Sequence, residues 1–224
     1  LKHARQVTIA YNVMTNNWAQ AQNGVAILIS PRNQNGSCTW CVVEDVTLEY
    51  NLIRHAGGGI KISGWDDTHP SQQTDNIVLR HNEFSDMAKA WGGNGYIVTL
   101  LSGARNVTFD HNTMVSPDLS MLTVDNVPME NFRFTNNVLR HNSYGFKGTG
   151  RATGNDTIGH YFPGRVIERN VFAGGKASIY PAGNLFPTVA DFEAHFTDYV
   201  QLDYSLVAGT DWEGVGTHSL DLGA

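Results

Sequence analysis

The densest group of side chains capable of acid–base chemistry lies in the stretch KISGWDDTHP, residues 61–70. It supplies an amine, two adjacent carboxyl groups and an imidazole, from Lys61, Asp66, Asp67 and His69. In one interpretation the two aspartates are the acid and base of glycoside hydrolysis, which requires a suitable carboxyl separation. In another, Asp66 and Asp67 help to hold Ca²⁺. The plain alternative is that Asp-Asp-Thr is an ordinary polar turn beside an outward-facing lysine.

Tryptophans form a second group of candidates, because four of them fall in expected loops or at loop edges. They are Trp18, Trp40, Trp65 and Trp91. An aromatic plate beside a groove is a suitable surface for a sugar ring. We therefore predict that Trp18, Trp65 and Trp91 contact carbohydrate. The competing interpretation is that these rings pin long loops onto the surface beneath them.

The elements that must position these residues repeat along the chain. A short alternation of apolar and polar residues runs into an asparagine six times, at Asn12, Asn51, Asn82, Asn112, Asn137 and Asn170. Each asparagine has an apolar residue three positions before it and another two positions after it. Alternation indicates strands, and asparagine favours a turn. The irregular spacing excludes a strict helical array.

A second strand is expected after each asparagine turn. The six segments read GVAILIS, GGGIKIS, GYIVTLL, SMLTVD, YGFKGT and ASIYP. One coil of chain cannot bury its apolar face alone, whereas stacked coils can. We therefore predict an all-β parallel β-helix solenoid of about six coils over residues 1–184, with an internal ladder of asparagines.

These repeats resemble the right-handed parallel β-helix proteins of the pectate-lyase-like superfamily, especially secreted bacterial members. The resemblance covers residues 1–184 and implies an extended polysaccharide held along one strand face, framed by longer loops. The longest expected loops are residues 29–46, 64–76 and 86–95. If the activity were that of a polysaccharide lyase, the resemblance implies that Lys61 abstracts the α-proton while Ca²⁺ neutralises a uronate carboxylate.

Outward positions of the second strands are expected to stack in a polar row of Lys61, Val98, Thr123 and Lys147. Asp125 lies two residues beyond Thr123. Because glycans present many hydroxyl groups, we predict that Lys147 and Asp125 contact carbohydrate, although plain solvent-exposed surface is an equal alternative.

Residues 185–224 break the repeat. PTVADFEAHF, with Pro187 near its start, predicts a short helix. A solenoid needs its open end covered, because exposed strand edges recruit other strands. We expect this segment to be a C-terminal cap within the same domain.

Composition narrows the classes of partner. The chain has 224 residues and a formal net charge of −6, which argues against a nucleic-acid partner. No apolar run approaches the roughly 18 residues of a membrane span. Cys38 and Cys41 in CTWC are the only cysteines. A tight loop disulfide in a secreted protein is favoured over two thiols or a redox or metal pair.

The sequence thus predicts a secreted, monomeric carbohydrate-active protein, either on its own or as part of a longer multidomain chain. A polysaccharide lyase or glycoside hydrolase, with Ca²⁺ as a candidate cofactor, is the first hypothesis. The alternative is a non-catalytic carbohydrate-binding module or surface adhesin with the same fold.

Overall fold

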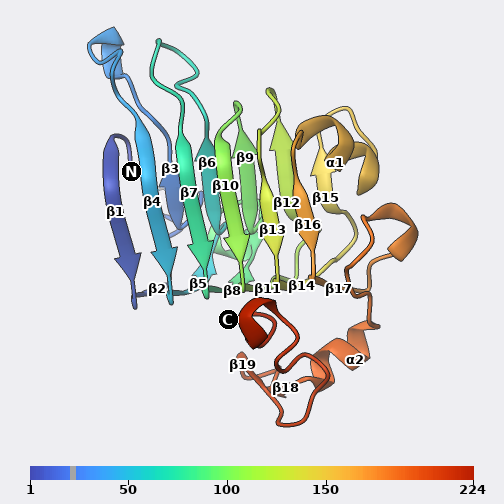
Figure 1. The fold of residues 1–224 in the computed structure, drawn as a ribbon. Coiled ribbons are helices and arrows are strands. Elements are labelled where there is room, and N and C mark those ends of the chain that lie inside the picture. The colour runs from blue at the N-terminus through green and yellow to red at the C-terminus, as the bar shows by residue number, and fades with distance from the viewer. Residues whose placement is uncertain (21–23) are drawn as a thin grey trace.

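The chain winds into a parallel β-helix made of three sheets that run along its length (Figure 1). The computed structural model describes residues 1–20 and 24–224. Sheet A contains β1 (Ala4–Ala10), β4 (Val43–Glu49), β7 (Asp75–Arg80), β10 (Arg105–Asp110), β13 (Arg133–Thr135) and β16 (Val166–Glu168). Sheet B contains β2 (Val13–Thr15), β5 (Leu52–Ala56), β8 (Glu83–Met87), β11 (Thr113–Val115), β14 (Val138–Arg140) and β17 (Val171–Ala173). Sheet C contains β3 (Ile27–Ile29), β6 (Ile60–Ser63), β9 (Val98–Leu101), β12 (Ser120–Asp125) and β15 (Gly145–Gly148).

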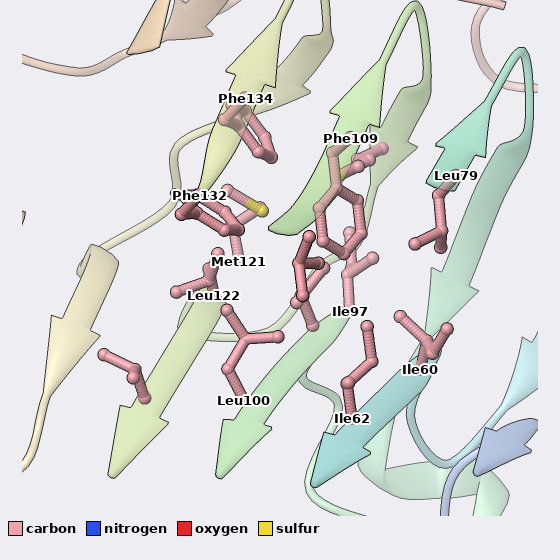
Figure 2. Close-up of a cluster of buried hydrophobic side chains, with 14 of the residues drawn as sticks. Ile60, Ile62, Leu79, Ile97, Leu100, Phe109, Met121, Leu122, Phe132 and Phe134 are labelled. Carbon is pink, nitrogen blue, oxygen red and sulfur yellow. The ribbon is translucent and has the colours of Figure 1, made fainter. Parts of the chain in front are cut away.

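The core is built from inward rows that cross all the coils. In sheet A, the residue three positions before each asparagine forms the row Ile9, Leu48, Leu79, Phe109, Phe134 and Ile167. In sheet B, the residue two positions after it forms the row Met14, Ile53, Phe84, Met114, Leu139 and Phe172. These rows confirm the predicted register. Figure 2 shows sheet A side chains such as Phe109 and sheet C side chains such as Leu100 in one apolar interior.

The asparagines lie at the corner between sheets A and B and are joined by side-chain hydrogen bonds. In the middle of the series, the Asn82 backbone N–H and its Nδ2 both donate to Asn112 Oδ1, each at 3.0 Å. Asn112 donates in the same way to Asn137. The pattern continues to Asn170, which donates to Asn184 Oδ1. Because these amides are buried in the central coils, each hydrogen bond satisfies a group that water cannot reach.

The residue before each asparagine has a left-handed backbone conformation, with φ near 55° in residues such as Tyr50 and His111. This conformation turns the chain sharply from sheet A into sheet B. The side chains at this position stack outside the corner, where ring centroids lie 5.1 Å apart for Tyr11 and Tyr50 and 4.9 Å apart for Tyr50 and His81. His81 and His111 both occupy this position, and their ring centroids lie 5.1 Å apart, so these histidines are members of a structural stack.

The last coil differs from the prediction, because its expected sheet C strand ASIYP contains a 3₁₀ helix, η3 (Ala177–Ile179). The core ends instead under α1 (Asn155–Tyr161), whose Ile158 and Tyr161 are buried. Phe162, just after α1, stacks on Phe132 at 4.3 Å. Bulky side chains thus close the stack where a sixth sheet C strand was expected.

The C-terminal segment folds back along the solenoid. The expected helix is present as α2 (Val189–Ala194), and Thr188 caps it by accepting a hydrogen bond from the Asp191 N–H. It is followed by the antiparallel pair β18 (Phe196–Asp198) and β19 (Asp203–Leu206), then by η4 (Thr217–Ser219).

Only the first residues of the segment meet the end of the stack, where Leu185 bridges to Val171. The remainder lies over the outer face of sheet B, below the strands in Figure 1. Phe192 and Trp212 pack there against Val138 and Val171. Several outward positions of the later sheet B strands are apolar, namely Val115, Val138, Val171 and Ala173, and the C-terminal segment covers them.

Candidate functional site

The outer face of sheet C carries a continuous row of side chains. Strand register aligns Leu28, Lys61, Thr99, Thr123 and Lys147 on adjacent strands. The prediction that Val98 belongs to this row is wrong, because Val98 pairs with the inward-facing Ile60 and is fully buried. The one-residue shift matters because successive strand residues point to opposite faces. The corrected row is more polar than expected, since a hydroxyl replaces an apolar side chain.

Two hollows open on this face. The first has a volume of about 620 Å³ and is lined by the side chains of Asn17, Lys61, Asn94 and Thr99, among others. Its polar groups are amides, an amine and a hydroxyl, all suited to hydrogen bonding with sugar hydroxyl or carboxylate groups, and Val25, Ala26 and Leu28 add apolar surface.

The second hollow has a volume of about 330 Å³ and is lined by Tyr96, Thr123, Asp125 and Lys147, among others. Thr123 Oγ1 lies 3.4 Å from Thr99 Oγ1, which joins this hollow to the first along the row. The structure therefore brings the predicted pair Lys147 and Asp125 together. Lys61 lies three strands from Lys147, roughly 14 Å away at the usual strand spacing. We call this surface the sheet C groove.

Lys61, Lys147 and Asp125 set the electrostatics of the sheet C groove. Among the residues that the structure describes, the Lys61 side chain has no hydrogen-bond or ion-pair partner. The Lys147 Nζ donates to the carbonyl oxygen of Arg151. An amine that projects from an acidic protein without a carboxylate partner favours a negatively charged ligand group.

Gly57, Gly58 and Gly59 shape the first hollow from beneath. A Cβ on Gly57 would lie 2.6 Å from the Gly93 nitrogen, and one on Gly59 would lie 2.5 Å from the Ile97 oxygen. This corner of the second coil is so narrow that the first and third coils contact each other across it. There the Gly24 N–H donates to the Gly92 carbonyl at 3.0 Å.

Asp66 lies apart from Lys61, in the loop after β6. Its side chain has no exposed surface. It accepts hydrogen bonds from the backbone N–H groups of Asn33 at 2.7 Å, Thr68 at 2.8 Å and His69 at 3.2 Å. Burial alone raises the pKa of Asp66, but these amides and the Arg32 guanidinium outweigh it and lower the pKa below its usual range. Such a carboxylate holds a loop and is a poor proton donor.

Asp67 and His69 belong to the same loop. The exposed Asp67 forms an ion pair with Arg32 at 2.8 Å. The His69 ring lies beside Gly36 of η1 (Gln34–Gly36) in the preceding coil. Neither residue lines the groove hollow that contains Lys61.

Residues 30–42 and 64–74 thus form a pair of loops that project together at the corner between sheets C and A (Figure 1). The Asn33 amide donates to the Pro70 carbonyl, and Gln72 donates to the Thr39 carbonyl at 2.9 Å. Cys38 and Cys41 form a disulfide within the first loop. We call these segments the paired loops.

The tryptophans occupy different settings. Trp18 and Trp40 are 71% and 62% exposed, and Trp40 makes an edge contact with His3. Trp65 is 38% exposed and directly follows the sheet C strand β6. Trp91, in η2 (Lys89–Trp91), donates from Nε1 to Asp86 Oδ2 at 2.8 Å. Trp91 therefore pins its loop, whereas Trp18 and Trp65 offer exposed rings at the two sides of sheet C.

His55 shares the Asp86 carboxylate with Trp91. Its Nδ1 lies 2.7 Å from Asp86 Oδ2, and its ring centroid lies 5.1 Å from that of Trp91. This contact ties the loop of the third coil to the second.

Within residues 1–20 and 24–224, no group of three or more His, Cys, Asp or Glu side chains is arranged to hold a metal ion. Over the same residues, no helix has the length and apolar character needed to cross a membrane.

Sequence reasoning missed Asn17, Asn94, Tyr96 and Thr99 as groove residues. Thr99 was available from the alternation of β9, where Val98 and Leu100 are the inward pair. Asn17, Asn94 and Tyr96 lie on irregular connections between sheets B and C, whose path no period predicts.

Comparison of this chain with protein-family models, with curated proteins and with solved structures finds no match. The fold and the groove are therefore the features from which function is inferred.

Proposed function

We propose that this protein is a carbohydrate-binding β-helix that holds an extended acidic polysaccharide along the sheet C groove. The observation that carries the proposal is the row Lys61, Thr99, Thr123 and Lys147, which crosses four neighbouring strands with a hollow at either end. A linear polymer can follow such a row from coil to coil.

The chemistry of the groove favours this class of ligand. Hydroxyl and amide groups are both donors and acceptors, as sugar hydroxyls require. The two lysines favour uronate or other acidic sugars, although the whole chain carries a net charge of −6. Exposed Trp65 and Trp18 at the margins provide surfaces for ring stacking.

Catalysis by a lyase is the second candidate, and the position of Lys61 in the larger hollow supports it. An amine beside a bound uronate is placed to remove a proton next to its carboxyl group. Within the hollow, the described lining residues include no carboxylate that would form an acid–base pair with Lys61. Binding is therefore preferred over hydrolysis by a carboxylate pair.

The test of binding is titration with acidic and neutral oligosaccharides, followed by calorimetry at low and high salt. We expect acidic oligosaccharides to bind more tightly, and Lys61→Ala to weaken them about tenfold with a reduced salt dependence. Lys176→Ala is the matched control, because Lys176 is exposed and lines neither groove hollow. Equal binding by wild type and Lys61→Ala contradicts the proposal.

The test of lyase activity is the absorbance of unsaturated products, measured with and without a chelator. A product signal that Lys61→Ala abolishes supports the second candidate. A signal that Lys61→Ala leaves unchanged removes it. Binding without any product identifies a non-catalytic module.

We further propose that the chain is related to the pectate-lyase-like superfamily and is secreted. The stacked asparagines and three parallel sheets support the first statement. The disulfide between Cys38 and Cys41 supports the second, because disulfides persist in oxidising compartments.

A further inference from the structure

A second elongated hollow lies on the other side of the molecule, where the C-terminal segment meets the outer face of sheet B. It consists of three adjoining hollows with volumes of about 450, 260 and 310 Å³. The first two share Leu202 and Tyr204, and the last two share Pro117 and Arg140. Shared walls make them one trough, which we call the sheet B trough.

The sheet B trough crosses the strands at right angles. Its lining begins at Arg54 on β5 and ends at Ala173 on β17. Those strands are separated by four steps of the sheet, or roughly 19 Å. The trough is therefore long and narrow, and its volumes fall in the range of ordinary ligand sites.

Tyr204 is the central polar group of the trough. The residue is only 6% exposed, yet it lines both of the first two hollows. Within the described residues the Tyr204 hydroxyl makes no hydrogen bond. Its oxygen atom is accessible to solvent. Burial raises the pKa of the Tyr204 phenol, so the hydroxyl stays protonated and can donate. A hydroxyl that opens into a hollow and has no partner in the protein is free to bond a ligand group.

The cation at one end of the trough already has partners. Arg54 forms an ion pair with Glu83 at 2.8 Å and donates to the Leu202 carbonyl at 2.6 Å. These contacts fasten the C-terminal segment to sheet B, and they leave the Arg54 charge neutralised by Glu83.

The cation in the middle of the trough is also engaged. Arg140 donates to the Tyr199 hydroxyl at 3.1 Å and lies 3.6 Å from a Glu193 oxygen. The acid beside it, Asp86, accepts from Trp91 and pairs with His55. Arg54, Arg140 and Asp86 are thus matched within the protein. Asp203, which also lines the trough, accepts from the Ser205 hydroxyl and forms no ion pair among the described residues.

The groups that remain for a ligand are uncharged except for the Asp203 carboxylate, which can accept a hydrogen bond from a sugar hydroxyl and disfavours an anion. Tyr204 contributes its hydroxyl, and Gln201 and Ser143 add an amide and a second hydroxyl at the rim. No partner for these three side-chain groups occurs among residues 1–20 and 24–224. Val200, 80% exposed, adds an apolar edge. Neutral donors and acceptors beside aromatic and apolar surface suit a sugar ring better than an ion.

We propose that the sheet B trough is a second glycan site, which binds a short stretch of neutral oligosaccharide through the Tyr204 hydroxyl. The site is separate from the sheet C groove and differs from it in ligand charge. Its existence does not depend on binding at the groove.

The test is titration of the ¹⁵N-labelled full chain with neutral oligosaccharides of glucose, xylose, mannose and galactose. We expect at least one to shift amide resonances in residues 199–205 and 83–86. Tyr204→Phe removes only the hydroxyl and should weaken that oligosaccharide about tenfold, because one buried hydrogen bond is lost. Val200→Arg, at the exposed rim, should obstruct the trough without disturbing the core.

Lys61→Ala is the control that separates the two sites, because it should leave neutral binding at the trough unchanged. The proposal is overturned if none of the four neutral oligosaccharides binds. It is also overturned if Tyr204→Phe and Val200→Arg both bind like the wild type, or if only acidic oligosaccharides shift the trough resonances.

Discussion

Two regions of this molecule bury polar side chains, and they do so in different ways. At the corner between sheets A and B, asparagines repeat in every coil and bond to one another along the stack. In the paired loops, Asp66 is a single buried carboxylate that organises the backbone around it. A polar residue that repeats in every coil can therefore be recognised from the sequence as structural. A structural polar residue that occurs once resembles a catalytic residue.

The largest expected effect comes from breaking the repeated series in its middle. Asn112→Ala removes donors to Asn137 and to the Leu79 carbonyl and also the acceptor for Asn82. Several buried groups lose partners, so we expect the free energy of unfolding to fall by about 3 kcal/mol. Chemical denaturation measures this loss.

The matched control is Asn12→Ala at the edge of the series. Asn12 is exposed and makes fewer of these bonds, so a loss of about 1 kcal/mol is expected. Equal losses of unfolding free energy at the two positions would show that a buried asparagine stabilises the fold no more than an exposed one.

The next effect is local to the paired loops. Asp66→Ala leaves three backbone N–H groups without their acceptor, at a cost of about 2 kcal/mol. Hydrogen exchange should accelerate at Asn33, Thr68 and His69, while the sheets exchange as in the wild type. Unchanged exchange at these amides would contradict the structural role of Asp66.

The pH dependence of the free energy of unfolding should also distinguish the two regions. The pKa of Asp66 is lowered in the folded protein, so its contribution to stability is complete above the unfolded pKa of about 3.9. It is lost as the pH falls through the folded pKa. Asp66→Asn cannot titrate, so the stability difference between wild type and this variant should shrink on acidification below about pH 4. The asparagine series contains no titrating group and should show no such dependence.

The smallest effect is expected at Asp67, the neighbour of Asp66. It pairs with Arg32 at an exposed position, and such pairs contribute little. Asp67→Ala should change the free energy of unfolding by less than about 0.5 kcal/mol. A loss as large as that of Asp66→Ala would mean that the two carboxylates act as one unit.

The fold could be predicted from the sequence because the same pattern of apolar residues around an asparagine recurs in every coil. The inward rows ending at Ile167 and Phe172, and the position of each asparagine, follow from alternation and a fixed offset. The departures lie where one coil differs from the rest. ASIYP occupies a strand position but forms η3, and its Tyr180 stacks on Phe172 and accepts a hydrogen bond from the Phe146 N–H.

The candidate site was predicted less completely. Lys61, Lys147 and Asp125 were placed correctly on the outer face of sheet C, since strand alternation determines which side chains point outward. The grouping of Lys61 with Asp66 and His69 rested on nearness in sequence. In space the loop turns away, and backbone amides of an adjacent coil surround the carboxylate.

The narrow corner at Gly57 has a consequence for how this chain can vary among relatives. Solenoids commonly lengthen or shorten by gaining or losing whole repeats. Here the Gly24 N–H reaches past the second coil to the Gly92 carbonyl in the third. Inserting a repeat between those coils would separate that donor from its acceptor, and removing the second coil would eliminate the glycine corner that lets them meet. Changes in repeat number are therefore expected beyond the third coil, with the first three inherited as one block.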